Sequence, residues 1–261
     1  MHAARALGLD LAWTDTNPTG ACALDRAGRL VDEQHLYSDD EVVAWIRDVA
    51  ADEAVVAVDA PLQVPNETGR RAGEPELAHE YNSRKAGPHS SNRSRLIEVH
   101  GRVRGEDLRH RLANEGFQGP WSGSRRTLIE VYPHPALVES FGLEARLVYK
   151  AKRGVSVDQR REGLRTLDRL LGLLKEADPP MDAPRLPISS DVRGRSLKEI
   201  EDRLDARICA WIAAAWHRHG TERVRLFGSE EAGHIAVPVG EFVSPEAVDE
   251  ALRPLRGSVG K

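Results

Sequence analysis

Short apolar runs alternate with polar turns over the first sixty residues, and this pattern predicts three strands, a helix and a fourth strand. Ser38 suits a helix N-cap, acidic residues fill the first turn after it, and an apolar stripe of helical spacing follows as far as about Asp52. The run before Asp59 is short, continuous and rich in valine, as in a parallel strand buried on both faces. The strands are expected at residues 5–11, 19–24, 29–37 and 54–59.

This order of elements has a geometric consequence for two aspartates. A right-handed crossover through the helix returns the fourth strand beside the first and parallel to it. Asp10 and Asp59, each near the end of its strand, would then be neighbours at one sheet edge. Two close carboxylates repel and raise each other's pKa unless a cation lies between them. Their proximity therefore points to metal or proton chemistry.

The remainder of the chain divides into an irregular stretch and a second ordered part. Residues 63–126 are rich in Gly, Pro, Arg and His, and this segment is interpreted as an insertion within a single domain spanning residues 1–261. Ser196 and Glu199 suggest a capping box for the last long helix, and Gly220 should end it. A fifth strand is expected at 127–133, helices at about 136–141, 157–176 and 196–220, and a late hairpin at 224–239.

Composition narrows the class of protein. The 261 residues are 40% hydrophobic, which is ordinary for a globular protein, and the formal net charge of −4 gives no global attraction to nucleic acid. A local excess of five positive charges lies between Ser83 and Arg111. Cys22 and Cys209 form no paired metal or redox motif. Without a signal peptide or a long apolar run, the protein is expected to be cytoplasmic and not bound to membranes. Its oligomeric state stays open.

Four carboxylates stand out because apolar residues surround them. They are Asp10, Asp59, Glu130 and Asp205. Asp205 shares a helix face with buried-type residues, and Asp202 lies one turn earlier on that face. Each acid also has a structural alternative. Asp10 would cap a turn, Asp59 would satisfy amides at a strand end, Glu130 would pair with a structural arginine, and Asp205 would pair with Arg203 or Arg207 on a solvated flank.

Taken together, the acids favour a site for hard divalent cations. Oxygen ligands without cysteine or paired histidines suit Mg²⁺ or Mn²⁺ better than zinc. Two such ions stabilise both the attacking and the leaving oxygen of a phosphoryl displacement, so the expected substrate is anionic. Candidate phosphate-binding residues are Lys150, Lys152, Arg84 and Arg93, each with a solvated loop or surface as its alternative. Glycine-rich nucleotide loops and the common zinc and serine hydrolase motifs are absent from the sequence.

Several short motifs together resemble one family. They are GLDLAW, VAVDAPL, AGPHSSNRS, IEVYPHP, the YK pair at 149–150, LDARICAWIAAAW and GHIAVP. The combination resembles the domain of unknown function 429 family, described as predicted nucleases with a ribonuclease H-like fold, over about residues 5–238. The resemblance implies an α/β fold with a mixed five-stranded sheet of order 3-2-1-4-5 flanked by helices.

The resemblance also implies roles for individual residues. Asp10, Asp59 and Asp205 match the metal ligands on the first strand, the fourth strand and the C-terminal helix. Glu130 matches the acidic residue of the E-x-Y-P segment, and Lys150 matches the tyrosine-lysine pair. The chain departs from the pattern after the DAP motif, where many relatives carry a cysteine-aspartate-arginine segment and this chain has Glu80 and Arg84.

The leading hypothesis is a nuclease that hydrolyses DNA or RNA with two Mg²⁺ or Mn²⁺ ions. Asp10 would bridge the ions, Asp59 and Asp205 would each hold one, and Glu130 would bind or orient the attacking water. One alternative is a non-catalytic nucleic-acid or protein-binding module on the same fold. Another is an actin-like ATP-dependent phosphotransferase, which needs glycine-rich phosphate loops and a duplicated core that the sequence lacks.

Overall fold

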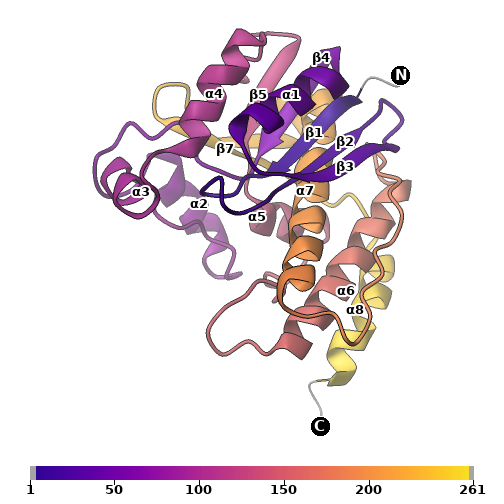
Figure 1. Cartoon of the computed structure of the whole chain (residues 1–261). Helices are drawn as coiled ribbons and strands as arrows, with labels where there is room; N and C mark the ends of the chain where they lie inside the picture. Colours follow the sequence, from indigo (N-terminus) through magenta and orange to yellow (C-terminus); the bar gives the residue numbers. More distant parts are fainter. Residues whose placement is uncertain (1–3, 259–261) are drawn as a thin grey trace.

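The computed structural model of the chain describes residues 4–258 and contains one mixed sheet with helices on both faces (Figure 1). The strand order is β3-β2-β1-β4-β5; the pairs β3–β2 and β2–β1 are antiparallel, and the pairs β1–β4 and β4–β5 are parallel. The strands are β1 (Ala4–Asp10), β2 (Thr19–Leu24), β3 (Leu30–Leu36), β4 (Ala50–Val58) and β5 (Arg126–Glu130). The five-stranded sheet expected from the resemblance is confirmed.

The crossover between β3 and β4 is formed by α1 (Asp39–Val49). Ser38 and Glu41 make the reciprocal hydrogen bonds of a capping box at its start. The helix ends three residues before the expected Asp52, because β4 begins at Ala50 and pairs there with the start of β1. Glu53 in this added part of β4 accepts a hydrogen bond from Arg5 (2.9 Å).

Alternation along the strands gives the sheet two buried faces. Leu7, Leu9 and Val56 pack in one hydrophobic cluster with α1 and with α4 (Arg104–Asn114). Ala6 and Ala57, one position away, point into the other cluster, which includes the helices that follow β5. Because successive strand side chains point to opposite faces, the near-continuous apolar runs of β1 and β4 fill both layers.

The segment 63–126 contains α4 and two shorter helices, α2 (Gly73–Tyr81) and α3 (Arg93–His100). Leu77 of α2 belongs to one buried cluster, and Leu108 of α4 belongs to the other. Its helices therefore pack on both faces of the sheet.

The second half of the chain is mainly helical up to a terminal hairpin and one last helix. Its elements are α5 (Pro133–Ser140), α6 (Val157–Leu173), η1 (Leu174–Glu176), α7 (Gly194–His219), η2 (Gly220–Glu222), β6 (Val224–Ser229), β7 (Gly233–Pro238) and α8 (Pro245–Ser258). The hairpin of β6 and β7 was expected, whereas α8 was not. Within residues 4–258, no helix combines the length and the apolar character that spanning a membrane requires.

Two expected boundaries in this half are wrong. β5 ends at Glu130 and α5 starts at Pro133, because proline has the backbone torsion of a first helical residue and cannot donate within a strand. Ser196 does not cap α7, which begins at Gly194 without a side-chain cap. Glu199 instead accepts a hydrogen bond from Arg195 (3.0 Å).

Helix α7 lies directly on the backbone of β1 and β2. A Cβ atom added at Gly8 would be 2.1 Å from the backbone nitrogen of Ala210 and 2.2 Å from the carbonyl oxygen of Ala206. A Cβ atom at Gly20 would be 2.2 Å from the carbonyl oxygen of Asp202. The two glycines thus let the helix approach the strands closely, next to the strand end that carries Asp10.

We expect Gly8→Ala to destabilise the fold by about 3 kcal/mol or more, because the clashing atoms belong to helix backbone that cannot rotate away. Urea unfolding followed by circular dichroism measures the loss. Gly119→Ala is the matched control, since a Cβ atom there meets nothing within 4 Å. Equal unfolding midpoints for the two variants would contradict this account of the packing.

Candidate functional site

The ends of β1 and β4 bring two aspartates together. Leu9 pairs with Val58 in the parallel ladder, and the amide of Asp59 donates to the carbonyl oxygen of Leu9 (2.9 Å). Asp10 and Asp59 each follow a residue that points toward α1, so both side chains point to the α7 side of the sheet. The expected juxtaposition of these two acids is present.

Asp205 joins them from α7. Its side chain is fully buried, and one carboxylate oxygen accepts a hydrogen bond from the hydroxyl of Tyr149 (2.8 Å). The ammonium nitrogen of Lys150 lies 2.9 Å from the other oxygen. Arg203 and Arg207 both bond Glu33 instead, so the alternative that Asp205 pairs with either of them is wrong.

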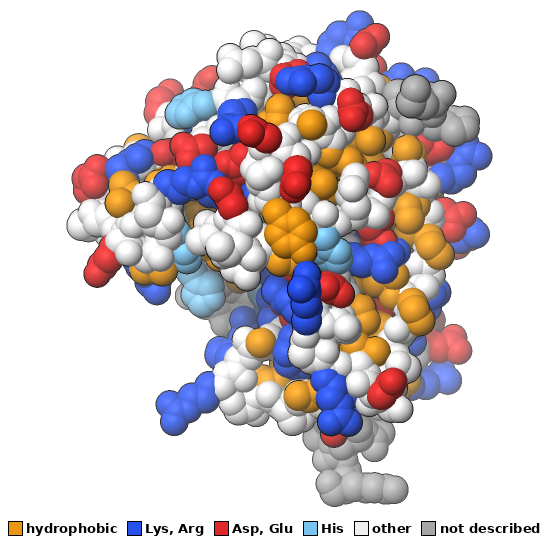
Figure 2. All heavy atoms as spheres, in the orientation of Figure 1, with side chains coloured by type: hydrophobic (Ala, Val, Ile, Leu, Met, Phe, Trp, Pro, Cys, Tyr) orange, Lys and Arg blue, Asp and Glu red, His pale blue; other side chains and the backbone are white. Residues whose placement is uncertain are grey.

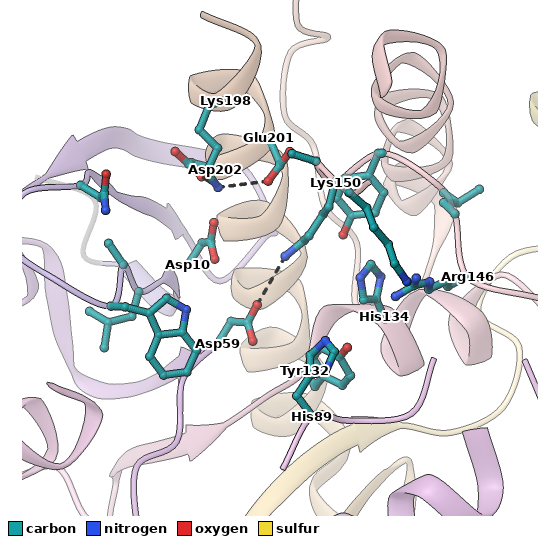
Figure 3. Close-up of a pocket in the computed structure, with 18 of the residues that line it drawn as sticks. Asp10, Asp59, His89, Tyr132, His134, Arg146, Lys150, Lys198, Glu201 and Asp202 are labelled. Atoms are coloured by element: carbon teal, nitrogen blue, oxygen red, sulfur yellow. Dashed lines mark hydrogen bonds and ion pairs between the residues drawn. The ribbon is translucent and has the colours of Figure 1, made fainter. Parts of the chain in front are cut away.

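Lys150 supplies the positive charge among the three aspartates. Besides Asp205, its ammonium group lies 3.9 Å from a carboxylate oxygen of Asp59, as the dashed line in Figure 3 marks. The ammonium is within 4 Å of Asp59 and Asp205 and acts electrostatically on Asp10, so bound protons or a further cation would offset the remaining negative charge of the three acids.

The electrostatics follow from burial and from this crowding. Burial raises the pKa of Asp59 to about 7, with Lys150 opposing the rise and Asp205 adding to it. Burial, together with Asp205 and Asp59, also holds the pKa of Asp10 well above its ordinary value, again against Lys150. Burial by itself would lower the pKa of Lys150, but the facing carboxylates raise it well above the ordinary value. The lysine therefore stays charged.

A second pair of acids lies one turn earlier on α7. Lys198 contacts Asp202 and lies 3.0 Å from Glu201, and Arg160 also contacts Glu201 (3.1 Å). The second carboxylate oxygen of Asp202 is buried without a hydrogen-bond partner. Lys150 and Lys198 both lower the pKa of Asp10 and so stabilise its charged form. Asp10 is therefore influenced by the lysine of each of the two acidic groups.

Except for the fully buried Asp205, these acids and the two lysines line a cavity of about 760 Å³ (Figure 3). Acids from the sheet and α7 face it from one side, and Arg146, Tyr132 and His134 face it from the other. Lys152 is exposed and also lines it. Burial holds the pKa of His134 well below its ordinary value, so this imidazole is neutral.

The sequence-based reasoning missed several lining residues, among them Trp13, Arg146 and Lys198. Helical spacing offered a signal for Lys198, because it precedes Asp202 by four positions and so shares its helix face. Trp13 and Arg146 carried no such signal, since both lie in loops whose path depends on tertiary contacts.

Glu130 lies elsewhere. It is opposite Val58 in the β4–β5 ladder, and paired residues point to the same side of a sheet, so it points away from the α7 face. There it forms two hydrogen bonds with Arg71 (2.6 and 2.7 Å) and accepts another from the amide of Leu62. The alternative of a structural arginine partner therefore describes its contacts.

The two candidate arginines from the segment 63–126 are also outside the cavity. Arg84 bonds Glu139 (2.8 Å) and backbone carbonyls, and Arg93 bonds Glu106 (2.6 Å). Glu80, in the stretch that departs from the family pattern, contacts Arg225. Of the four expected phosphate-binding residues, the structure brings only Lys150 and Lys152 to the cavity.

The donor chemistry suits a hard cation, but the ligand arrangement is not preformed. Among the residues that the structure describes, no three His, Cys, Asp or Glu side chains are arranged as a metal-ligand set. An ammonium group lies between acids at each of the two acidic groups. Cation binding at Asp59 and Asp205 would thus require Lys150 to move from its present position.

Comparison with known proteins gives one match. The model of a family described as protein of unknown function, DUF429, matches residues 8–232. No curated protein and no solved structure was found to match the chain. The family description assigns no activity, so any functional conclusion depends on the site itself.

The buried pair of Glu130 and Arg71 generates a stability prediction. We expect Glu130→Ala to lower the free energy of unfolding by about 2–4 kcal/mol, because it removes two charge-assisted hydrogen bonds from a buried guanidinium and leaves it with Glu74 as its remaining acidic partner. Denaturant unfolding measures the change. A stability loss under about 1 kcal/mol would contradict the structural role of this pair.

The raised pKa of Asp59 generates a second prediction. The folded protein keeps a proton on Asp59 up to about pH 7, whereas the unfolded chain releases it near the ordinary aspartate value. In the absence of divalent cations, stability should therefore fall as the pH rises between these values. Asp59→Asn should be more stable than the parent above pH 7, by about 2–4 kcal/mol.

Thermal and denaturant unfolding at pH 5 and pH 8, in chelator, test this expectation. Asp52→Asn is the control, because Asp52 is exposed near the other end of the same strand, and it should change stability by less than about 0.5 kcal/mol. A less stable Asp59→Asn protein at pH 8 would refute the electrostatic account.

Proposed function

The chain belongs to the DUF429 family, and from its site we propose that it is a Mg²⁺- or Mn²⁺-dependent hydrolase of phosphodiester bonds in DNA or RNA. One observation carries the proposal. Asp10 at the end of β1 and Asp59 just after β4 line one cavity, and the ammonium of Lys150 joins Asp59 to Asp205, which lies fully buried on α7.

The residues fit a hard divalent cation by charge and by donor type. Holding one fully buried and two half-buried carboxylates around one lysine is costly unless protons or more positive charge arrive. Asp202 adds a buried carboxylate oxygen without a partner beside the same cavity. Asp10, Asp59 and Asp205 would hold one ion. Asp10 and Asp202 would hold the second, consistent with the influence of both lysines on Asp10.

The chain's own groups would bind and orient the substrate. Divalent ions in such a site would lower the pKa of a water and stabilise charge on the phosphate oxygens. Lys150, once displaced from Asp205, would remain in reach of an anionic substrate in the same cavity, and Lys152 and Arg146 line its wall. Charge-assisted hydrogen bonds from these groups suit a phosphodiester. Glu130 has no part in this proposal.

The topology supports the proposal by analogy. Acids at the ends of the first and fourth strands and on a helix over the sheet are the arrangement that the ribonuclease H-like resemblance implies. Proteins that share a fold often differ in function, so the chemistry of the site carries more weight than the likeness of fold. The cytoplasmic location expected from the sequence stays a prediction.

A specific observation favours one other candidate, a binding module without turnover. Lys150 and Lys198 already lie between the acids, as they would in a site that no longer binds metal. The actin-like phosphotransferase gains no such support, because residues 4–258 hold one five-stranded sheet and one two-stranded sheet, without the duplicate core that it needs.

The test is a cleavage screen with Mn²⁺ and with Mg²⁺ over single-stranded, duplex, hybrid and junction substrates. We expect cleavage that a chelator abolishes. Asp10→Asn and Asp59→Asn should each lower the rate by more than ~100-fold, because loss of a supporting residue at a metal site already costs about 10–100-fold.

Asp52→Asn should cleave at the parent rate, since Asp52 is exposed and outside the cavity. Full activity of Asp10→Asn and Asp59→Asn, or equal cleavage in chelator, would refute the assignment. Metal-independent binding without cleavage of any substrate would favour the binding module.

A further inference from the structure

Trp13 is exposed at the cavity that holds the aspartates. Its relative exposure is 46%, it follows Asp10 by three residues, and it lines the same cavity as Asp10 and Asp59. Single exposed apolar side chains are common on proteins and need no function. What distinguishes Trp13 is how firmly the surrounding structure fixes it.

The backbone on both sides of Trp13 is held by one buried arginine. Arg104 is 2% exposed, and its guanidinium donates to the carbonyl oxygens of Ala12 (2.8 Å) and Thr14 (3.1 Å). Asp39 fixes the same guanidinium through a further hydrogen bond (2.7 Å). The loop is therefore anchored on each side of an exposed ring.

The ring itself is oriented by stacking. The rings of Trp13 and His100 are nearly parallel, with centroids 5.0 Å apart and an interplanar angle of 12°. His100 is the last residue of α3, so this helix supports one face of the indole. An exposed aromatic plane held in one orientation is what a stacking ligand requires, because little ordering remains to be done on binding.

The cavity favours an unpaired nucleotide over a duplex. Its volume of about 760 Å³ lies within the range of small-molecule sites, roughly 300–1,000 Å³, and Asp205 beneath it is fully buried. Acidic side chains lie among the basic ones over much of the face in Figure 2, and they would repel the closely spaced phosphates of a duplex. A flexible strand meets such a site with a base on an aromatic ring and a phosphate on nearby cations.

We propose that Trp13, stacked on His100, is the platform for an unpaired nucleobase next to the phosphodiester that water would hydrolyse at the acidic site. The substrate class is thus single-stranded nucleic acid, or an unpaired end or loop. This inference deepens the proposed function and rests on it. Trp13 is a specificity-determining residue, since it would bind the base without touching the reacting phosphate.

The test measures binding separately from cleavage. All proteins carry Asp10→Asn so that the strand stays intact, and the probes are a labelled single-stranded oligonucleotide, the same strand with abasic positions, and a duplex. Fluorescence anisotropy in Mg²⁺ gives the affinities. We expect Trp13→Ala to weaken binding of the intact strand about 5- to 100-fold, the usual effect of removing one base–aromatic stack. Trp13→Tyr should retain most of the affinity.

Trp121→Ala is the matched control. Trp121 is exposed to a similar extent, 42%, but lines a different cavity, so its removal should leave binding unchanged. The abasic strand should bind the Trp13→Ala and Trp13 proteins alike. Equal binding of the intact strand to both proteins, or an equal loss for intact and abasic strands, would overturn the proposal. Thermal unfolding checks that each variant is folded.

The two proposals fail in different ways. If Trp13→Ala loses base-dependent binding but the parent chain cleaves nothing with Mn²⁺, the platform stands and the hydrolase proposal fails. If the parent chain cleaves and Trp13→Ala in the Asp10-containing chain keeps the same KM on single strands, the platform fails alone.

Discussion

The close approach of α7 to the backbone of β1 and β2 is the contact on which the site depends. Gly8 and Gly20 leave no side chain between helix and strands, so the helix lies nearer than ordinary side-chain packing allows. Asp205 thereby reaches the side of the sheet to which Asp10 and Asp59 point, and Asp202 lies beside Gly20, the ladder partner of Asp10. The same close packing of α7 on the strands therefore builds the core and places the acids.

That convergence creates an electrostatic conflict. Burial raises the pKa values of Asp10 and Asp59, and the lysines that compensate them leave part of the negative charge unmatched. Perturbed carboxylates in a cavity are typical of functional sites, because proteins rarely keep such a cost for structure alone. Under the proposed function the same conflict would link stability to activity, because the carboxylates proposed to bind a cation weaken the cation-free fold.

Tertiary contacts also place charged residues with similar sequence surroundings in different parts of the structure. Glu130 and Asp59 both end parallel strands, yet a difference of one position in the ladder points them to opposite faces. Arg84 and Arg93 are held by carboxylates and carbonyls of their own surroundings, whereas Lys150 and Lys152 reach the cavity. Arg104 serves the site indirectly, by anchoring the loop of Trp13.

The sequence by itself determined the crossover and the meeting of Asp10 with Asp59, whereas the complete strand order was implied by the family resemblance. The crossover and the meeting of the two acids follow from apolar periodicity, capping and the handedness of parallel connections, all of which are local or nearly local rules. Only the tertiary structure decided that Lys150 lies among the acids, that Glu130 pairs with Arg71, and that Trp13 faces the cavity. Such facts depend on ladder register, loop path and helix approach, because a shift of one residue or a few ångströms changes which side chains meet.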